Sequence, residues 1–264
     1  MVFKMTRLLI SWKLYRLLLL SLCVSANVFA DLPDIIQQIK PSIVGIGTYQ
    51  PTRAPQSKFL GTGFVVGDGQ HIITNAHVLP EVLDTENNEI LAILIPAEGN
   101  RASGRQVSIV AQDKDHDLAL LKISGARLSA LQLDTERRIR EGETYAFTGF
   151  PIGAILGLKP VTHQGIISAI TPIVEPAKSS KALTAAIIRR QKEPYNVYQL
   201  DATAYPGNSG SPLYDLKTGK VVAVINSVFV KTTKENVLKD PSGITYAIPA
   251  KYVEALIEKA KSAR

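Results

Sequence analysis

A chain of 264 residues, of which 45% are hydrophobic and 20% charged, has the composition of a globular protein with a core of its own. It contains no low-complexity tract and no solenoid-type repeat, which excludes fibrous and repeat architectures. Four of the 30 basic residues lie in the first 30 residues, where no acidic residue occurs. Thirty less four leaves 26 basic residues against 23 acidic ones, and this net charge of +3 gives no indication of nucleic-acid binding.

Residues 1–30 have the pattern of a secretory signal. A basic start is followed by a leucine-rich run over residues 17–24 and then by Val28-Phe29-Ala30, with small residues where a signal peptidase reads them. We therefore expect cleavage after Ala30. The alternative is a retained membrane anchor, for which the apolar run over residues 17–30 is short.

The single cysteine, Cys23, lies inside this leader. The mature protein is therefore expected to contain no disulfide although it is exported. This combination is more typical of a bacterial envelope protein than of a eukaryotic secreted one. We expect the bacterial periplasm as its location.

The mature chain begins with a helical pattern over residues 32–40, which Pro41 ends, and then changes to short β-type runs separated by Gly, Pro, Asn and Asp turns. The first group of runs comprises residues 42–49, 61–66, 71–75, 89–95, 106–113 and 118–123. After a charged linker at 136–143, the second group comprises residues 144–149, 159–170, 197–202, 220–230 and 244–248.

Residues 249–264 start with an amphipathic pattern and a proline, which predicts a C-terminal helix. Two groups of short strands with helices only at the ends predict an all-β fold of two six-stranded antiparallel β-barrels, over residues 31–135 and 144–248. Residues 172–194 interrupt the second group with a basic, mixed sequence. We interpret them as an exposed surface insertion, and their role stays open.

Ser209 lies in the most informative stretch, which runs from Tyr205 to Pro212 and reads Tyr-Pro-Gly-Asn-Ser-Gly-Ser-Pro. Small residues expose a serine hydroxyl and let main-chain N–H groups point at the space beside it. An acyl-transfer enzyme needs both features, one for its nucleophile and one for the oxyanion. Serine and glycine clusters are more often plain surface turns, so this stretch does not decide the function alone.

A serine nucleophile needs a base within hydrogen-bond reach, usually a histidine. His77 is the best candidate, because a β run passes there into a turn of small residues. His71 opens a strand and is expected to be exposed, whereas His163 lies inside a strand and suits a structural role. His116 could compete with His77, but it lies in a polar turn without small neighbours.

The base in turn needs an acceptor that holds its tautomer, and Asp117 is the candidate. It leads directly into the apolar run 118–123, so we expect it to be partly buried and to need a partner; the alternative is an exposed aspartate at a strand start. A metal site could also be imagined in the cluster Asp113, Asp115, His116 and Asp117. Its spacing fits neither an EF-hand loop nor a HExxH helix, and we expect no metal and no cofactor.

The three candidates occur in the order His77, Asp117, Ser209, with the first two in the first strand group and the serine in the second. This is the order of chymotrypsin and differs from those of subtilisins and α/β-hydrolases. A site at the interface of the two barrels follows from it.

The sequence resembles trypsin-like serine peptidases and, within them, the protease domain of the HtrA group. Four blocks carry the resemblance and span nearly all of the mature chain: residues 61–66 (GTGFVV) with 73–78 (ITNAHV), residues 117–123 (DLALLKI), residues 200–203 (LDAT) through 206–210 (PGNSG), and residues 246–249 (YAIP). The resemblance implies a serine endopeptidase with His77 as general base, Asp117 as its orienting acid and Ser209 as nucleophile. It also implies an oxyanion hole formed by the backbone N–H groups of Gly207 and Ser209.

Some features depart from the family pattern. Val78 replaces the cysteine that follows the histidine in animal digestive members, and Asn208 replaces their aspartate, which argues against activation by a new N-terminus. Ser211 stands where the HtrA pattern has a second glycine, a variant that resembles glutamyl endopeptidases. The chain also stops at Arg264 without the PDZ domain of HtrA proteases, so we expect no PDZ-based substrate tethering, and the resemblance does not imply an oligomeric cage.

By the same resemblance, the primary specificity pocket is lined by Thr203, Ile225, Asn226 and Ser227. None of these residues is charged, and no histidine is among them to bind a glutamate side chain. We therefore expect a small or medium apolar residue before the scissile bond.

The leading hypothesis is an exported serine endopeptidase that cleaves proteins or peptides through an acyl-enzyme, without a nucleic-acid partner and without a membrane span once the signal is removed. The sequence does not define an oligomeric state. The competing hypothesis is a binding or scaffold protein that keeps the fold with a malformed oxyanion turn, and residues 172–194 would then supply its contact surface.

Overall fold

The structure is a computed structural model that describes residues 31–97, 102–153, 157–173, 194–226 and 243–262. The predicted signal peptide, most of the predicted surface insertion and Ser227 lie outside the described residues. The described residues form one compact unit. No helix among them is long and apolar enough to cross a membrane.

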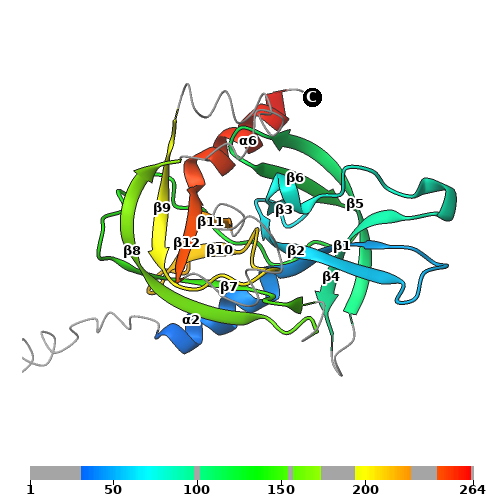
Figure 1. The fold of residues 1–264 in the computed structure, drawn as a ribbon, viewed down its shortest axis with the longest axis horizontal. Coiled ribbons are helices and arrows are strands. Elements are labelled where there is room, and N and C mark those ends of the chain that lie inside the picture. The colour runs from blue at the N-terminus through cyan, green and yellow to red at the C-terminus, as the bar shows by residue number, and fades with distance from the viewer. Residues whose placement is uncertain (1–30, 98–101, 154–156, 174–193, 227–242, 263–264) are drawn as a thin grey trace, which may run out of the picture. The chain divides into compact units, whose positions relative to one another are not determined.

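Within these residues, twelve strands form two closed antiparallel barrels (Figure 1). The first barrel, at the right of the figure, has the strand order β1-β2-β3-β6-β5-β4 and consists of β1 Ile43–Tyr49, β2 Ser57–Val66, β3 His71–Thr74, β4 Ile90–Pro96, β5 Ala102–Asp113 and β6 Leu118–Ile123. The second has the order β10-β11-β12-β9-β8-β7 and consists of β7 Thr144–Gly149, β8 Val161–Pro172, β9 Asn196–Asp201, β10 Pro212–Asp215, β11 Val221–Asn226 and β12 Ile244–Pro249. The prediction of two six-stranded barrels is confirmed.

The sequence pattern missed β10, the strand that follows the nucleophile stretch. It has only four residues and begins at Pro212, which lacks an N–H for strand pairing and normally marks a turn or a strand start. All four residues are nevertheless buried, and the strand pairs with both β7 and β11. The second barrel closes through this short strand.

Each barrel encloses an apolar core of its own. Val44, Ile72 and Leu121 are fully buried in the first, and Phe147, Leu200 and Ile225 in the second. The short β-type runs of the sequence supply these side chains by alternating between the inside and the outside of the barrel wall.

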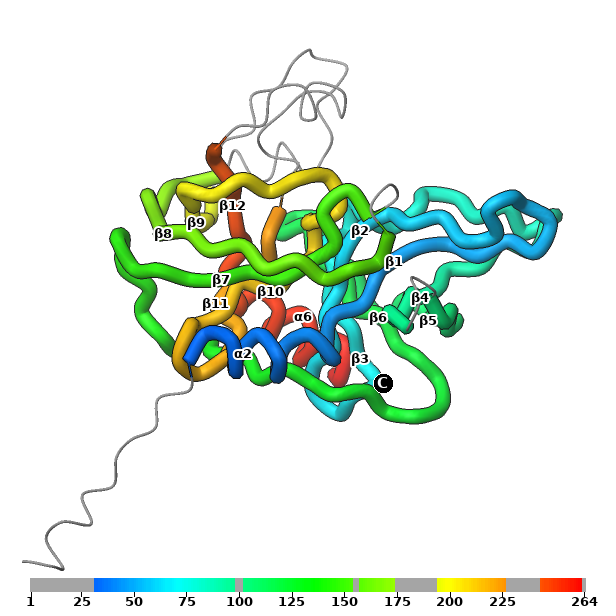
Figure 2. Tube along the Cα trace, turned by 90° about the horizontal axis from the view of Figure 1, so that it is seen from below, coloured from blue at the N-terminus to red at the C-terminus, as the bar shows by residue number. Residues whose placement is uncertain are grey.

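Two helices cover the barrels. Helix α2 (Leu32–Ile39) is capped by Asp31, whose carboxylate accepts from the N–H of Leu32. It runs beside the β10–β11 turn (Figure 2), and its buried residues Ile35 and Ile39 lie next to Gly219 of that turn. Helix α6 (Ala250–Ser262) packs against β5 and β6 of the first barrel and against β11 and β12 of the second. The C-terminal helix therefore contacts both barrels.

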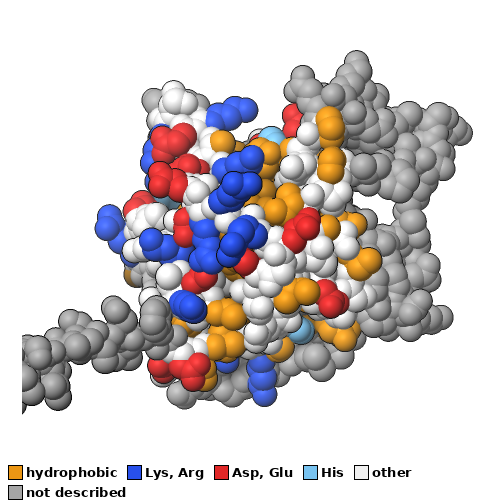
Figure 3. Space-filling view, turned by 90° about the vertical axis from the view of Figure 1, so that its left-hand side faces the viewer, with side chains coloured by type: hydrophobic (Ala, Val, Ile, Leu, Met, Phe, Trp, Pro, Cys, Tyr) orange, Lys and Arg blue, Asp and Glu red, His pale blue; other side chains and the backbone are white. Residues whose placement is uncertain are grey.

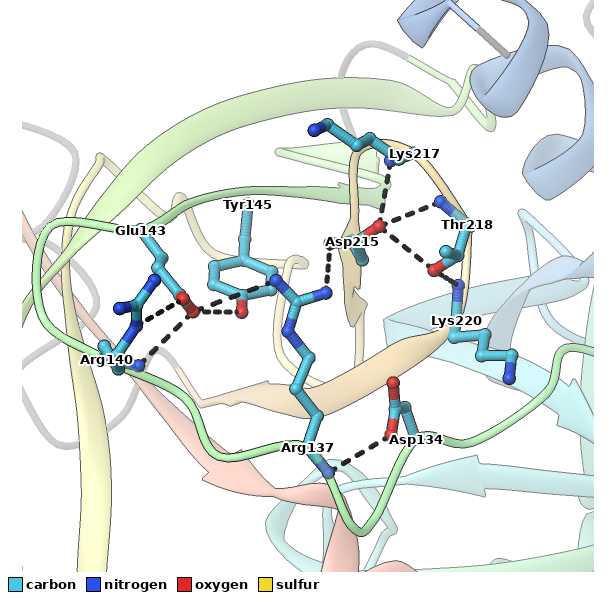
Figure 4. A network of polar contacts seen from close by, with 9 residues as sticks. All are labelled: Asp134, Arg137, Arg140, Glu143, Tyr145, Asp215, Lys217, Thr218 and Lys220. Carbon is cyan, nitrogen blue, oxygen red and sulfur yellow. Dashed lines mark hydrogen bonds and ion pairs between the residues drawn. The ribbon is translucent and has the colours of Figure 1, made fainter. Parts of the chain in front are cut away.

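The linker between the barrels is fixed by a polar network (Figure 4). The guanidinium group of Arg137 binds the carboxylate of Asp215 at the end of β10 and lies 3.9 Å from the carboxylate of Glu143. Glu143 also accepts from Arg140 and from the hydroxyl of Tyr145. On the face of the second barrel shown in Figure 3, basic and acidic side chains are interspersed, with Lys and Arg beside Asp and Glu.

The Asp215 side chain is largely buried, with 9% of its surface exposed. Burial alone would raise the pKa of this carboxyl group. Hydrogen bonds from the backbone N–H groups of Lys217 and Thr218, together with Arg137, outweigh that effect and hold the pKa below its ordinary value of 3.8. The carboxylate therefore stabilises the folded state above pH 3.8, and this contribution is lost as the pH falls through that value and below it.

We predict that Asp215→Asn lowers the free energy of unfolding by about 2 kcal/mol at pH 7, because it removes the charged acceptor of these bonds. The difference from the wild type should shrink as the pH falls below 3.8. Urea unfolding at pH 7 and pH 3 measures both effects. As a control, Glu258→Gln breaks an exposed ion pair with Lys261 and should change stability by less than about 0.5 kcal/mol; an equal loss in both variants would contradict the prediction.

Candidate active site

His77 and Asp117 meet because their strands are neighbours. His77 lies in a short 3₁₀ turn, Ala76–Val78, that follows β3, and Asp117 directly precedes β6, which pairs with β3. The Nδ1 atom of His77 lies 2.6 Å from the Oδ2 atom of Asp117. Because the carboxylate can only accept, Nδ1 carries the proton of this hydrogen bond, and Nε2 is the ring nitrogen left to act as a base.

The Asp117 carboxylate is held by further donors. Its Oδ1 atom accepts from the backbone N–H of His77 at 2.9 Å, and Oδ2 accepts from the side-chain amide of Asn226 at 2.6 Å. The backbone carbonyl of Asp117 accepts from the Asn75 side chain and from the N–H of Ala76. A buried carboxylate needs such donors, since burial without them disfavours its charge.

Asn226 lies in β11 of the second barrel, so its bond to Asp117 crosses between the barrels. The sequence predicted this residue for the lining of the specificity pocket, and the structure shows in addition that its side-chain amide donates to Asp117. No local pattern indicates this contact, because the partners belong to different barrels.

In the acidic turn that follows β5, Asp113 and Asp117 bind different histidines. Asp113 accepts from the N–H groups of Asp115 and His116 and binds the His116 ring at 2.6 Å, while Asp117 faces His77. Burial alone would raise the pKa of the Asp113 carboxyl, but these bonds hold the pKa below its ordinary value. Asp117 itself has φ of +54°, a left-handed conformation that aspartate tolerates better than most residues.

The other histidines are held in different surroundings. His116 stacks on Tyr252 of α6 with ring centroids 3.9 Å apart. His163 stacks on Phe147 inside the second barrel at 4.9 Å, and burial lowers the pKa of its ring. His71 lies at the start of β3 beside Asp68, 2.7 Å from its carboxylate. Of the four, His77 is the one that meets Asp117.

The stretch before Ser209 is a tight turn. The N–H of Asn208 donates to the carbonyl of Tyr205 at 3.0 Å, and Gly207 has φ of +102°. Proline followed by a residue with positive φ is the signature of a type II turn, in which the second position needs glycine. The carbonyl of Pro206 accepts from the N–H of Ile152 at 2.7 Å, which fixes the peptide between Pro206 and Gly207.

Ser209 lies between the two barrels. Its carbonyl accepts from the N–H of Thr62 in β2, and the N–H of the next residue, Gly210, donates to the carbonyl of Ile225 in β11. Gly61 lies close to both Ser209 and the residue after His77. A Cβ on Gly61 would lie 2.8 Å from the side chain of Val78 and 3.2 Å from the carbonyl of Ser209. The structure thus brings the nucleophile turn and the residue after His77 to the same glycine.

Asn208 is fully buried, and neither polar atom of its side chain has a hydrogen-bond partner among the described residues. A buried neutral amide costs less than an unpaired carboxylate in the same place. Asparagine is therefore less costly at this buried position than an aspartate without a partner would be.

The described residues predicted to line the pocket differ in their burial. Ile225 is fully buried in the core of the second barrel. Thr203 is partly exposed in the segment before the nucleophile turn, and its neighbours Ala202 and Ala204 pack on that core. Sequence reasoning also left two contact residues without a role, Asn75 and Thr62. Both are polar residues of the first resemblance block, residues 61–66 with 73–78, and that position is the signal that could have indicated them.

A family model described as the trypsin-like peptidase domain matches residues 61–224, a range that contains the histidine, the aspartate and the serine. The chain belongs to the trypsin-like peptidase family. One relative is the chloroplastic Protease Do-like 5 of Arabidopsis thaliana, which is 29% identical over 82% of this chain and 65% of its own length.

Other trypsin-like relatives carry similar names. The mitochondrial serine protease HTRA2 of Drosophila grimshawi is 30% identical over 77% of this chain and 40% of its own, and a probable periplasmic serine endoprotease DegP-like of Halomonas elongata is 27% identical over 83% and 40%. The chain thus spans less than two thirds of the length of these relatives.

Solved structures agree on the trypsin-like fold. The Rv3671c protease from M. tuberculosis in its active form superposes with a TM-score of 0.61 at 21% identity, covering 86% of this chain and 83% of its own. The serine endoprotease from Yersinia pestis gives a TM-score of 0.59 at 24% identity, covering 89% and 68%.

We predict that Gly207→Ala destabilises the protein more than Gly142→Ala does. Both glycines have a positive φ, which strains alanine by about 1–2 kcal/mol. A Cβ at Gly207 would also overlap the carbonyl oxygen of Phe150, whereas one at Gly142 meets nothing within 4 Å. This overlap should add about 1–3 kcal/mol to the loss, measured by urea unfolding, and equal losses would contradict the close packing of the turn.

Proposed function

We propose that this protein is an exported serine endopeptidase in which Ser209, His77 and Asp117 form the catalytic triad. The observation that supports it best is the bond from the His77 ring to Asp117, which leaves Nε2 to act as a base. Val78, the residue after His77, and the Ser209 carbonyl both lie close to Gly61. The family of the chain and the names of its relatives agree with this activity.

The reaction proceeds through an acyl-enzyme. The Oγ atom of Ser209 attacks the scissile carbonyl carbon while His77 Nε2 takes its proton, and Asp117 stabilises the resulting imidazolium. Collapse of the tetrahedral intermediate breaks the C–N bond, and the imidazolium gives its proton to the leaving amine. Water then repeats the sequence on the ester, releases the second product and restores Ser209.

The backbone N–H groups of Gly207 and Ser209 stabilise the oxyanion of the intermediate. The bond from Ile152 to the Pro206 carbonyl supports this role. Carbonyl and N–H point in opposite directions across a planar trans peptide, so the N–H of Gly207 is directed away from Ile152. It makes no hydrogen bond with any residue that the structure describes.

The primary pocket accepts a small or medium apolar side chain, and its lining by resemblance to the family is Thr203, Ile225, Asn226 and Ser227. The uncharged character of Thr203, Ile225, Asn226 and Ser227 supports this preference. The leader over residues 1–30 directs the chain across the inner membrane to the bacterial periplasm, where proteins or peptides are its substrates. Both the leader pattern and the periplasmic names of bacterial relatives support that location.

We predict that a fluorophosphonate probe labels the wild-type protein at Ser209, because the probe reacts only with an activated serine. Ser209→Ala should abolish the label, His77→Ala should lower kcat by about 10⁶-fold, and Asp117→Asn by about 10⁴-fold. Gel fluorescence and peptide hydrolysis measure these effects. Ser211→Ala, in the same turn, is the matched control and should keep the label. A wild type that never labels would favour the binding-protein hypothesis instead.

We also predict that cleavage of a peptide library is dominated by Ala, Val and similar residues before the scissile bond, since an uncharged pocket gives a charged side chain no partner. Mass spectrometry of the products, with Ser209→Ala as the background control, gives the profile. A profile led by Arg, Lys or Glu would refute the assigned pocket while leaving the triad intact.

A further inference from the structure

Thr62 makes an unusual set of contacts for a strand residue. It lies in β2 of the first barrel and is fully buried. Its hydroxyl lies 2.6 Å from the carbonyl oxygen of Gly207 and 3.1 Å from the backbone nitrogen of Phe150. Its own N–H donates to the carbonyl of Ser209 at 2.9 Å. One residue of the first barrel thus binds the nucleophile turn of the second barrel at two places.

The direction of the hydroxyl bond is defined by its partners. A threonine hydroxyl has one proton to donate and two lone pairs to accept with. The N–H of Phe150 can only donate, so the hydroxyl accepts from it and gives its single proton to the Gly207 carbonyl. The hydroxyl therefore joins the end of β7 to the turn through a chain of two hydrogen bonds.

Gly207 is the residue whose geometry most needs such support. Glycine populates several backbone conformations at little cost, and rotation of either peptide beside it would redirect an N–H of the turn. The bond from Ile152 to Pro206 holds the peptide before Gly207. The peptide after Gly207 is held at its N–H by the bond to the carbonyl of Tyr205 and at its carbonyl by the bond from Thr62. Of these three bonds, only the one from Thr62 is made by a side chain, so a substitution can remove it.

We propose that Thr62 is a positioning residue for the oxyanion-binding turn, which its hydroxyl holds in the geometry that directs the Gly207 N–H at the developing oxyanion. The inference rests on the proposed function, since it needs Ser209 as nucleophile. Loss of the hydroxyl should weaken binding of the transition state more than binding of the substrate, because the turn contacts the oxyanion and not the ground-state side chains.

The test compares Thr62→Val, which keeps the shape and removes the hydroxyl, with Thr62→Ser, which keeps the hydroxyl. We expect Thr62→Val to lower kcat by about tenfold or more and to weaken binding of a peptide boronic acid by a similar factor, with KM changed by less than about twofold. Thr62→Ser should stay within about threefold of the wild type.

Thr48→Val is the matched structural control. Thr48 is also a buried threonine of the first barrel whose hydroxyl makes one donor and one acceptor bond, to Glu89 and from Arg53. It should lose stability in urea as Thr62→Val does, while kcat and boronic acid affinity stay at wild-type values. Thr62→Ala replaces the valine variant if that variant does not fold.

The positioning role would be overturned by wild-type kcat in Thr62→Val, or by an equal loss of kcat in Thr62→Ser or Thr48→Val. Unfolding of both Thr62→Val and Thr62→Ala would also overturn it. In each of these cases, fluorophosphonate labelling of the wild type would still support the triad. A wild type that neither reacts with fluorophosphonate nor cleaves peptides would overturn the proposed function and this inference together.

Discussion

The buried carboxylate of Asp117 is the constraint on which the arrangement of the barrels depends. Its side chain is only 11% exposed, and a carboxylate in such surroundings stays charged only where donors replace water. His77 of the first barrel supplies its ring and its N–H, and Asn226 of the second supplies its amide. These bonds therefore favour the one arrangement of the two barrels that brings all three donors to Asp117.

The nucleophile turn depends on the same docking. Its glycines permit the left-handed backbone that the turn needs, but they would also permit other conformations. Strand β2 binds the turn from the first barrel through Thr62, and β11 binds it from the second through the carbonyl of Ile225. The flexibility that makes the turn possible is thus limited by hydrogen bonds from both barrels.

Local patterns were sufficient to predict most of the architecture. The spacing around Ile35 and Ile39 predicted helix α2, and short β-type runs predicted all strands but β10, whose four residues begin at Pro212. The pairing of His77 with Asp117 could be predicted because His77 closely follows one apolar run and Asp117 directly precedes another. These two runs form the neighbouring strands β3 and β6. The role of His116 could not, because its stacking on Tyr252 depends on where α6 packs.

The two groups of strands, the type and order of the three candidate residues, and the glycines of the turn can all be read from the sequence. These features follow from periodicity and backbone preference, which depend on neighbours along the chain. The bond from Asn226 to Asp117 and the bond from Thr62 to the Gly207 carbonyl could be found only in the folded protein. Such partners lie far apart in the chain, and the choice among possible donors is made when the barrels pack together.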